Sequence, residues 1–179
     1  MNKRPRDSQR LKVYRAGWKV EDHGERFDDM VDLRAYVHKI FRSKWRKALY
    51  RKHNLDEHFH LYIGDGRARR GACMDNGWKR HYEIKFPRTT RRQQTILHEI
   101  AHILVEEIFT IGRGQRVAYH GREFCAIMLQ LVRRWMGPEQ AKMLKTSFKN
   151  NKVKHTMPRL DDIIRCPKCG HIMMGVIHV

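Results

Sequence analysis

The stretch TILHEIAHILVEEIF, residues 95–109, constrains the fold and the chemistry of this chain more than any other. His98 and His102 are four residues apart, so a helix places both imidazoles on one face, within reach of one ion. Glu99 lies beside them, where a carboxylate can contact a water on that ion without binding the ion itself. The stretch therefore predicts a zinc site with His98 and His102 as ligands and Glu99 as the base, on a helix whose apolar face carries Ile96, Ile100, Ile103 and Leu104.

The alternative is a buried helix in a chain with 12 histidines that contains the pattern by chance. The context favours the metal site. Thr90 and Gln93 form a capping-box pattern before the helix, Gly112 and Gly114 follow it, and a predicted sheet precedes it. Two histidines one turn apart, with a glutamate between them, are unusual for a core helix, so we expect a metal ion here.

A catalytic zinc site needs a third protein ligand and one open position. Ile108 stands where the extended form of the motif has a further histidine, and Glu106 lies one more turn, about 6 Å, along the helix axis. We therefore expect Glu106 to be an outer or solvated residue. His120, in YHGREFCAIM at the entry to the next helix, is the favoured third ligand, and Glu123 is the alternative.

Two neighbours of His120 are candidates for a role in the reaction. Tyr119 and Arg122 can each donate a hydrogen bond to an oxyanion that develops during acyl transfer. The alternative, equally compatible with the sequence, is that both are exposed loop residues.

LHEIAHIL and HGREFCAIM together resemble the SprT-like family of zinc metallopeptidases, which includes Spartan and joins a His-Glu-x-x-His helix to a later His-Gly-x-x-Phe element. The resemblance covers residues 30–148. It implies that His98, His102 and His120 bind zinc and that Glu99 is the catalytic base. RDSQRLKVY and MGPEQAKML are also similar to stretches of small metallohydrolases with the same core. Because SprT-like proteins are associated with DNA and with proteolysis of proteins crosslinked to it, the resemblance implies a protein substrate and a DNA partner.

Apolar periodicity and turn signals divide the chain into a basic N-terminal arm (1–26), a metallopeptidase domain (27–148), a linker (149–160) and a zinc-knuckle-like tail (161–179). The predicted fold class is α+β, a zincin-like minimal metalloprotease domain with a small antiparallel sheet. The expected elements are a strand around Lys12–Tyr14, a helix capped by Asp28 or Asp29, a helix over Lys44–Arg51, two or three strands between residues 58 and 87 that end with Arg80–Phe86, the helix of residues 95–109, and helices near Phe124 and at Pro138.

The tail contains the motif CPKCG, in which Cys166 and Cys169 resemble half of a zinc ribbon. A turn with two thiolates is typical of a zinc knuckle and makes a second zinc ion a hypothesis for the tail. An equal alternative is a remnant without metal, or a site shared between two chains. Completing four ligands at the tail requires histidines, and those available are His155, His171 and His178.

The other two cysteines, Cys73 and Cys125, are predicted to be buried apolar residues.

The chain has 38 lysines and arginines against 19 acidic residues, a formal net charge of +19. Such an excess indicates an anionic partner, nucleic acid before an anionic membrane surface, and says little about the fold. Aromatic residues among the basic clusters can stack on unpaired bases or, alternatively, anchor the core; they are Trp45, Tyr50, Trp78 and Tyr82.

The start MNKRPRDSQRLKVYR lacks the apolar run of a secretory signal, and no stretch reaches the ~20 apolar residues of a membrane span. Four cysteines in 179 residues do not indicate a disulfide scaffold, so we expect a cytoplasmic or nucleoid-associated protein without a membrane partner. Two rival functions stay open: a DNA-binding module with a structural zinc, and a metal-dependent hydrolase of a bond other than a peptide bond. The sequence indicates no oligomeric state.

Overall fold

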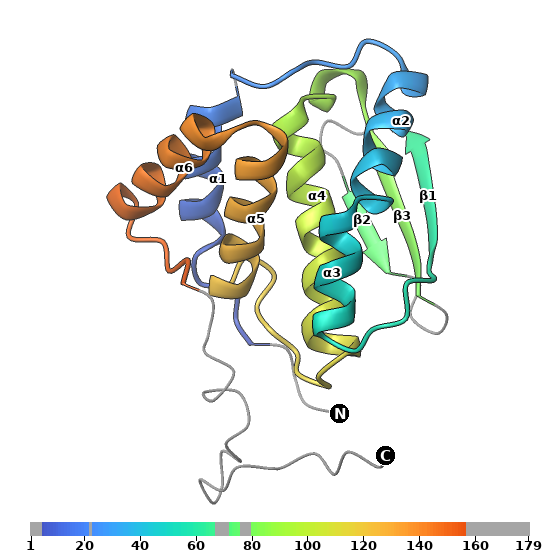
Figure 1. Ribbon diagram of the computed structural model, residues 1–179. Helices are drawn as coiled ribbons and strands as arrows, with labels where there is room; N and C mark the ends of the chain where they lie inside the picture. The colour runs from blue at the N-terminus through green and yellow to red at the C-terminus, as the bar shows by residue number, and fades with distance from the viewer. Residues whose placement is uncertain (1–4, 22, 67–71, 76–79, 157–179) are drawn as a thin grey trace, which may run out of the picture.

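The computed structural model describes residues 5–21, 23–66, 72–75 and 80–156, and these have an α+β fold, as predicted. Figure 1 shows α4 in the middle, between α5, α1 and α6 on one side and the sheet on the other. In chain order the elements are α1 (Arg10–Glu21), α2 (Met30–Phe41), α3 (Lys44–Lys52), β1 (His60–Asp65), β2 (Ala72–Asp75), β3 (His81–Phe86), the 3-10 helix η1 (Arg88–Thr90), α4 (Gln93–Val105), the π-helix η2 (Glu106–Ile111), α5 (Arg122–Trp135) and α6 (Pro138–Asn150).

Several helices begin where the sequence offers a capping residue. The side chain of Asp29 accepts hydrogen bonds from two backbone amides in the first turn of α2, and Ser43 caps α3 in the same way. Pro138 is the first residue of α6, where its missing N–H costs nothing because that position has no helical acceptor. The predicted starts of these three helices are therefore confirmed.

The sheet is mixed, so the prediction of an antiparallel sheet was wrong for one of its two pairings. The strand order is β1-β3-β2. β2 and β3 are antiparallel, whereas β1 is parallel to β3, with His60 opposite His81 and Asp65 opposite Phe86. β3 lies between the two strands that precede it in the chain. Alternation and turn residues show where strands form, but they do not show that a later strand inserts between two earlier ones.

Residues 10–21 form helix α1, so the predicted strand around Lys12–Tyr14 was wrong. Val13, Ala16 and Val20 are buried at helical spacing, and α1 packs against α6 and α4. The buried stripe consists of small apolar residues among many basic ones, which made its period hard to recognise in the sequence. This part of the predicted basic arm is therefore packed into the folded body.

The last described residues also pack against the body. α6 continues to Asn150, beyond the predicted domain end at 148, and Val153 is buried. The backbone of Lys154 bonds twice to the side chain of Gln9: its amide donates to Oε1 at 3.0 Å, and its carbonyl oxygen accepts from Nε2 at 3.1 Å. The first residues of the predicted linker thus lie beside the N-terminal segment.

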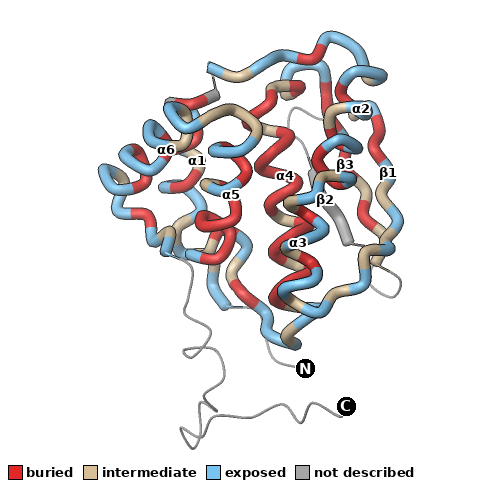
Figure 2. The backbone as a smooth tube through the Cα atoms, in the orientation of Figure 1, coloured by how far each residue is buried: buried red, intermediate tan, exposed pale blue. Residues whose placement is uncertain are grey.

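Most residues of α4 are buried, as Figure 2 shows along the middle of the molecule. The helix begins at Gln93 with Arg92 at the N-cap, so the predicted capping box at Thr90 was wrong. The Thr90 hydroxyl instead donates to the carbonyl oxygen of Pro87, within the turn of η1. α4 continues into the π-helix η2, which ends at Gly112, a glycine that the sequence analysis placed at the end of the helix.

Some predictions concern parts of the chain outside the described residues. These are Trp78, Cys166, Cys169 and the whole tail, together with the side chain of Cys73. Cys125 is fully buried, as predicted, and burial raises the pKa of its thiol. Among the described helices, none combines the length and apolar character of a membrane span.

Candidate metal centre

His98, His102 and His120 meet at one point, the last of them from a separate part of the chain. Nε2 of His98 lies 3.2 Å from Nε2 of His102 and 3.3 Å from Nε2 of His120. Nitrogen ligands 2.0–2.1 Å from a tetrahedral ion are about 3.3 Å apart, so these spacings fit ligands around one cation. Among the residues that the structure describes, these three histidines form a cluster whose ligand atoms lie close enough together to hold one metal ion.

Two elements position the ligands. α4 presents His98 and His102 one turn apart, and the turn before α5 presents His120. Gly121 follows His120 as the N-cap of α5, and a Cβ at this position would lie 3.1 Å from the carbonyl oxygen of Ala118. A residue without a side chain therefore allows the tight turn that directs His120 toward α4.

Two aromatic rings enclose the three histidines. Phe124, buried on α5, has its ring centroid 4.8, 4.5 and 5.0 Å from those of His98, His102 and His120. Tyr14 of α1 is stacked on His98 with a centroid distance of 5.4 Å and lies 5.1 Å from His120. His98 and His120 are buried, whereas His102 is half-buried. The centre is therefore most accessible on the side of His102.

A carboxylate from outside both sequence motifs contacts the third histidine. Oδ2 of Asp7 lies 2.7 Å from Nδ1 of His120, and Oδ1 of Asp7 accepts a hydrogen bond from the His120 backbone amide at 3.2 Å. When Nδ1 carries the proton, it donates to Asp7 and the lone pair of Nε2 is directed at the centre. Gln9 holds the same turn, because its Nε2 donates to the carbonyl oxygen of His120 at 2.7 Å.

Burial controls the charge of the centre. Burial, together with a smaller effect of the neighbouring His120, lowers the pKa of His98 to about 3. Burial also lowers the pKa of His120, although the contact with Asp7 opposes this change. These two imidazoles are therefore neutral at pH 7, which is the form that binds metal ions. Burial raises the pKa of Glu99 to about 7, which suits a group that exchanges a proton near neutral pH.

Comparison with known proteins gave no match. No family model matches the chain, nor does any curated protein or solved structure. The likeness to the SprT-like family therefore depends on the two sequence motifs, and the chemistry of the site depends on the geometry of the three histidines.

Other candidates from the sequence lie near the centre without belonging to it. Glu123, the alternative third ligand, is not part of the histidine group; its Oε1 lies 3.2 Å from Nε of Arg122. Tyr119 is exposed, and its ring centroid lies 6.2 Å from that of His102. Glu106 is half-buried at the start of η2. Of these residues, Tyr119 stands at the accessible side of the centre.

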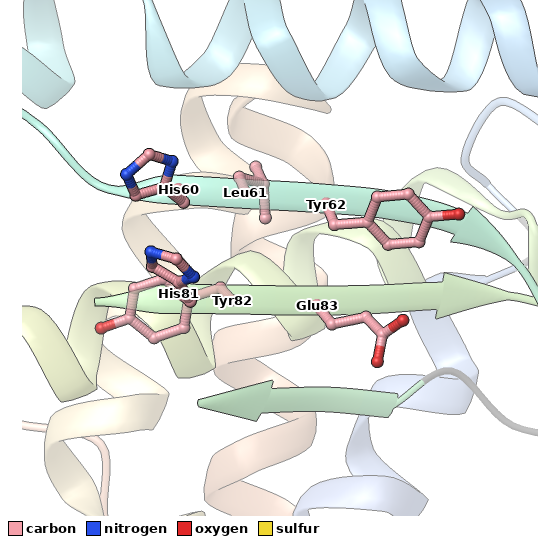
Figure 3. Close-up of a pocket in the computed structure, with 6 residues that line it drawn as sticks. All are labelled: His60, Leu61, Tyr62, His81, Tyr82 and Glu83. Carbon is pink, nitrogen blue, oxygen red and sulfur yellow. The ribbon is translucent and has the colours of Figure 1, made fainter. Parts of the chain in front are cut away.

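A pocket of about 460 Å³ lies on the sheet, and Figure 3 shows its side chains along β1 and β3. The rings of His60 and His81 face each other there, with centroids 4.2 Å apart. Glu83 is paired with Lys85 at 3.0 Å, so its carboxylate already has a partner. None of these residues belongs to the metal group found in the described chain. The pocket is lined by His60, Leu61, Tyr62, His81, Tyr82 and Glu83.

The aromatic residues considered for base stacking are mostly in the core. Tyr50 and Tyr82 are buried, as the alternative reading of the sequence expected, and Trp45 is partly buried against the core. Arg46 lies over the ring of Tyr50 at 3.9 Å, so this pairing of arginine and aromatic ring stabilises the fold. Base stacking by these two tyrosines is therefore excluded in the folded protein.

Sequence reasoning missed the contributions of the N-terminal segment. Asp7, Gln9 and Tyr14 all contact His120, yet no local pattern predicts a contact with a residue more than 100 positions away. The one available signal was the likeness of RDSQRLKVY to small metallohydrolases, since this stretch carries all three residues.

Proposed function

We propose that this protein is a zinc-dependent metallopeptidase of the SprT-like, zincin-like type, which hydrolyses peptide bonds of DNA-associated proteins. One observation carries the proposal: three histidine Nε2 atoms at spacings of 3.2 and 3.3 Å, with the buried residue Glu99 directly after His98 on the same helix. Three histidines with one open position form a ligand set of catalytic zinc, whereas structural sites use four protein ligands, usually with thiolates.

The side chains have separate roles in this reaction. A zinc ion, when bound, would make a water more acidic and polarise a carbonyl group. His98, His102 and His120 would hold the ion through Nε2. Glu99 accepts a proton from the attacking water at a carboxylate oxygen and passes it to the leaving amide nitrogen. Tyr119, on the accessible side of the centre, donates a hydrogen bond from its hydroxyl group to the oxyanion as the oxyanion forms.

The substrate lies along an edge of the sheet, where an extended peptide gains backbone hydrogen bonds. β2 is the favoured edge because it packs against α4, which carries two of the histidines. At the opposite edge, Nε of Arg34 already donates to the carbonyl oxygen of Ile63 in β1 at 3.0 Å. The net charge of +19 supports the DNA association, since DNA is a polyanion.

Glu99→Gln tests the proposal. The amide keeps the volume of the side chain but cannot accept a proton, so we expect the variant to bind one zinc per chain and to lose cleavage by at least ~100-fold. Zinc content is measured by elemental analysis, and cleavage is followed with a protein substrate bound to DNA. Glu25→Gln, at an exposed position, is the matched control and should cleave like the wild type.

Chelation separates the proposal from its rivals. Wild-type cleavage should stop when zinc is removed and return when zinc is added back. Retained proteolysis in Glu99→Gln contradicts the role of this glutamate. Cleavage of bare DNA or of a non-peptide bond, with proteins left intact, supports a different hydrolase. Metal and DNA binding without any cleavage supports a DNA-binding module with a structural zinc.

A further inference from the structure

The N-terminal segment contributes directly to the metal centre. Asp7 contacts Nδ1 of His120, Gln9 contacts the His120 carbonyl oxygen, and Tyr14 covers the rings of His98 and His120. These residues belong to neither of the two motifs that provide the histidines. The centre is therefore built from three separate parts of the chain, of which only two carry ligands.

Asp7 holds both the ring and the backbone of one ligand. Its two carboxylate oxygens bond to Nδ1 and to the backbone amide of His120, at 2.7 and 3.2 Å. The His120 side chain is 5% exposed and that of Asp7 is 20% exposed, so water competes little for the contact between them. A pair of bonds to ring and backbone restricts rotation of the ring and also selects the tautomer with its proton on Nδ1.

His120 needs such a partner more than the other two histidines do. His98 and His102 are fixed by a long buried helix, whereas His120 lies in a turn ahead of α5. A ligand on a turn is free to rotate unless other groups hold it. Asp7 bonds to the ring of His120, while Gln9 at 2.7 Å and the Cys125 thiol at 3.9 Å donate to its carbonyl oxygen. These contacts restrict the turn in the way that a helix restricts His98 and His102.

We infer that Asp7 is the positioning residue of the metal centre, which fixes the ring of His120 so that Nε2 faces the ion. Asp7 acts through His120 and does not contact the substrate. This inference rests on one part of the proposed function, namely that the centre binds zinc. It concerns the affinity for the metal and does not require that the protein cleaves peptide bonds.

Zinc affinity of the full chain provides the test, measured by competition with a chromophoric chelator. We expect Asp7→Ala to bind Zn²⁺ about 10- to 100-fold more weakly than the wild type. Asp7→Asn should fall between them, because its amide oxygen still accepts from Nδ1 but carries no charge. Asp28→Asn is the matched control, since the Asp28 side chain is 95% exposed, and its affinity should equal that of the wild type.

Two further measurements separate positioning from mere support of the fold. The visible spectrum of the Co²⁺-loaded protein reports ligand geometry, and we expect it to change in Asp7→Ala while circular dichroism of the metal-free protein stays the same. In a double-mutant cycle, Asp7→Ala should weaken Zn²⁺ binding much less in a His120→Ala background, because the residue through which it acts is gone.

Equal zinc affinity of Asp7→Ala and the wild type overturns the inference. An undiminished effect of Asp7→Ala in the His120→Ala background also overturns it, and so does a wild-type protein that binds no zinc. If Asp7→Ala does not fold, the affinity and Co²⁺ spectrum of Asp7→Asn decide the question. A zinc-binding wild type that cleaves no protein contradicts the proposed function, while the affinity series still decides the role of Asp7.

Discussion

A single buried carboxylate, that of Glu107, joins the end of the metal-site helix to the sheet. It is fully buried in η2, and its Oε1 accepts a hydrogen bond from the Tyr82 hydroxyl at 2.5 Å. The guanidinium group of Arg80 pairs with the same carboxylate and also donates to the carbonyl oxygen of Asp56 at 2.8 Å. A buried carboxylate is tolerated only with such partners, so this network fixes the π-helix against the start of β3.

Glu107→Ala should lower the free energy of unfolding by about 3 kcal/mol, since it removes the buried carboxylate to which both the Tyr82 hydroxyl and the Arg80 guanidinium group donate. Urea denaturation of the metal-free protein measures the loss. Glu25→Ala, at an exposed position, should change stability by less than about 0.5 kcal/mol. If both variants are equally stable, the carboxylate at position 107 does not have this role.

The clustering of the three histidines was predictable at the residue scale, in part because helical spacing is a local property. Two histidines four positions apart face the same way in any regular helix, and the structure brings His120 to them as the motif order indicated. The side chains around them were not predictable. Asp7 and Tyr14 reach the centre through the packing of α1, which no short pattern encodes.

Among the elements that sequence reasoning missed, α1 has the most consequence for the site, because it carries Tyr14 and begins directly after Asp7 and Gln9. The sequence of α1 has few apolar residues. The contacts of α1 with α6 and α4 show that these few residues are enough to bury one face of the helix. The helices α2 to α6 were predictable from apolar spacing and turn residues, whereas the start of α4 was not, because the predicted cap at Thr90 belongs to the turn before it. The direction of β1 relative to β3 was not predictable either, since strand order depends on contacts between distant residues.

Ala16→Leu tests whether α1 is part of the packed body. Ala16 is fully buried, and extra methyl and methylene groups there should lower the free energy of unfolding by about 1–3 kcal/mol. Arg15→Leu, the same new residue one position earlier on the exposed side, should change it by less than about 0.5 kcal/mol. Thermal or urea denaturation compares the two. Equal stability of both variants contradicts the packing of α1.

For the whole molecule, the dominant property is its charge. The formal net charge is +19. For the proposed association with DNA, we expect contacts with phosphates to contribute most of the affinity, because attraction between this charge and the phosphates does not depend on base sequence. α6, at one end of the molecule in Figure 1, has three exposed lysines on one face, Lys142, Lys145 and Lys149.

We expect affinity for random-sequence DNA to fall steeply with salt, with a slope of log K against log[salt] of about −0.9 per phosphate contacted. Replacing Lys142, Lys145 and Lys149 together by glutamine should reduce that slope by about 2 to 3, if α6 faces the DNA. Fluorescence anisotropy at several salt concentrations measures it. An affinity that does not change with salt would rule out an electrostatic interface.

The side chain of Gln9 holds two distant parts of the chain together, because it forms hydrogen bonds with the backbone of both His120 and Lys154. Terminal segments of a fold fray at a much smaller free-energy cost than global unfolding. When the segment that carries Gln9 detaches, the turn that carries His120 loses a restraint while α4 stays intact. If the centre holds an ion, as proposed, we expect this local fraying to speed its dissociation, so that the ion leaves at a lower temperature than the one at which the protein unfolds.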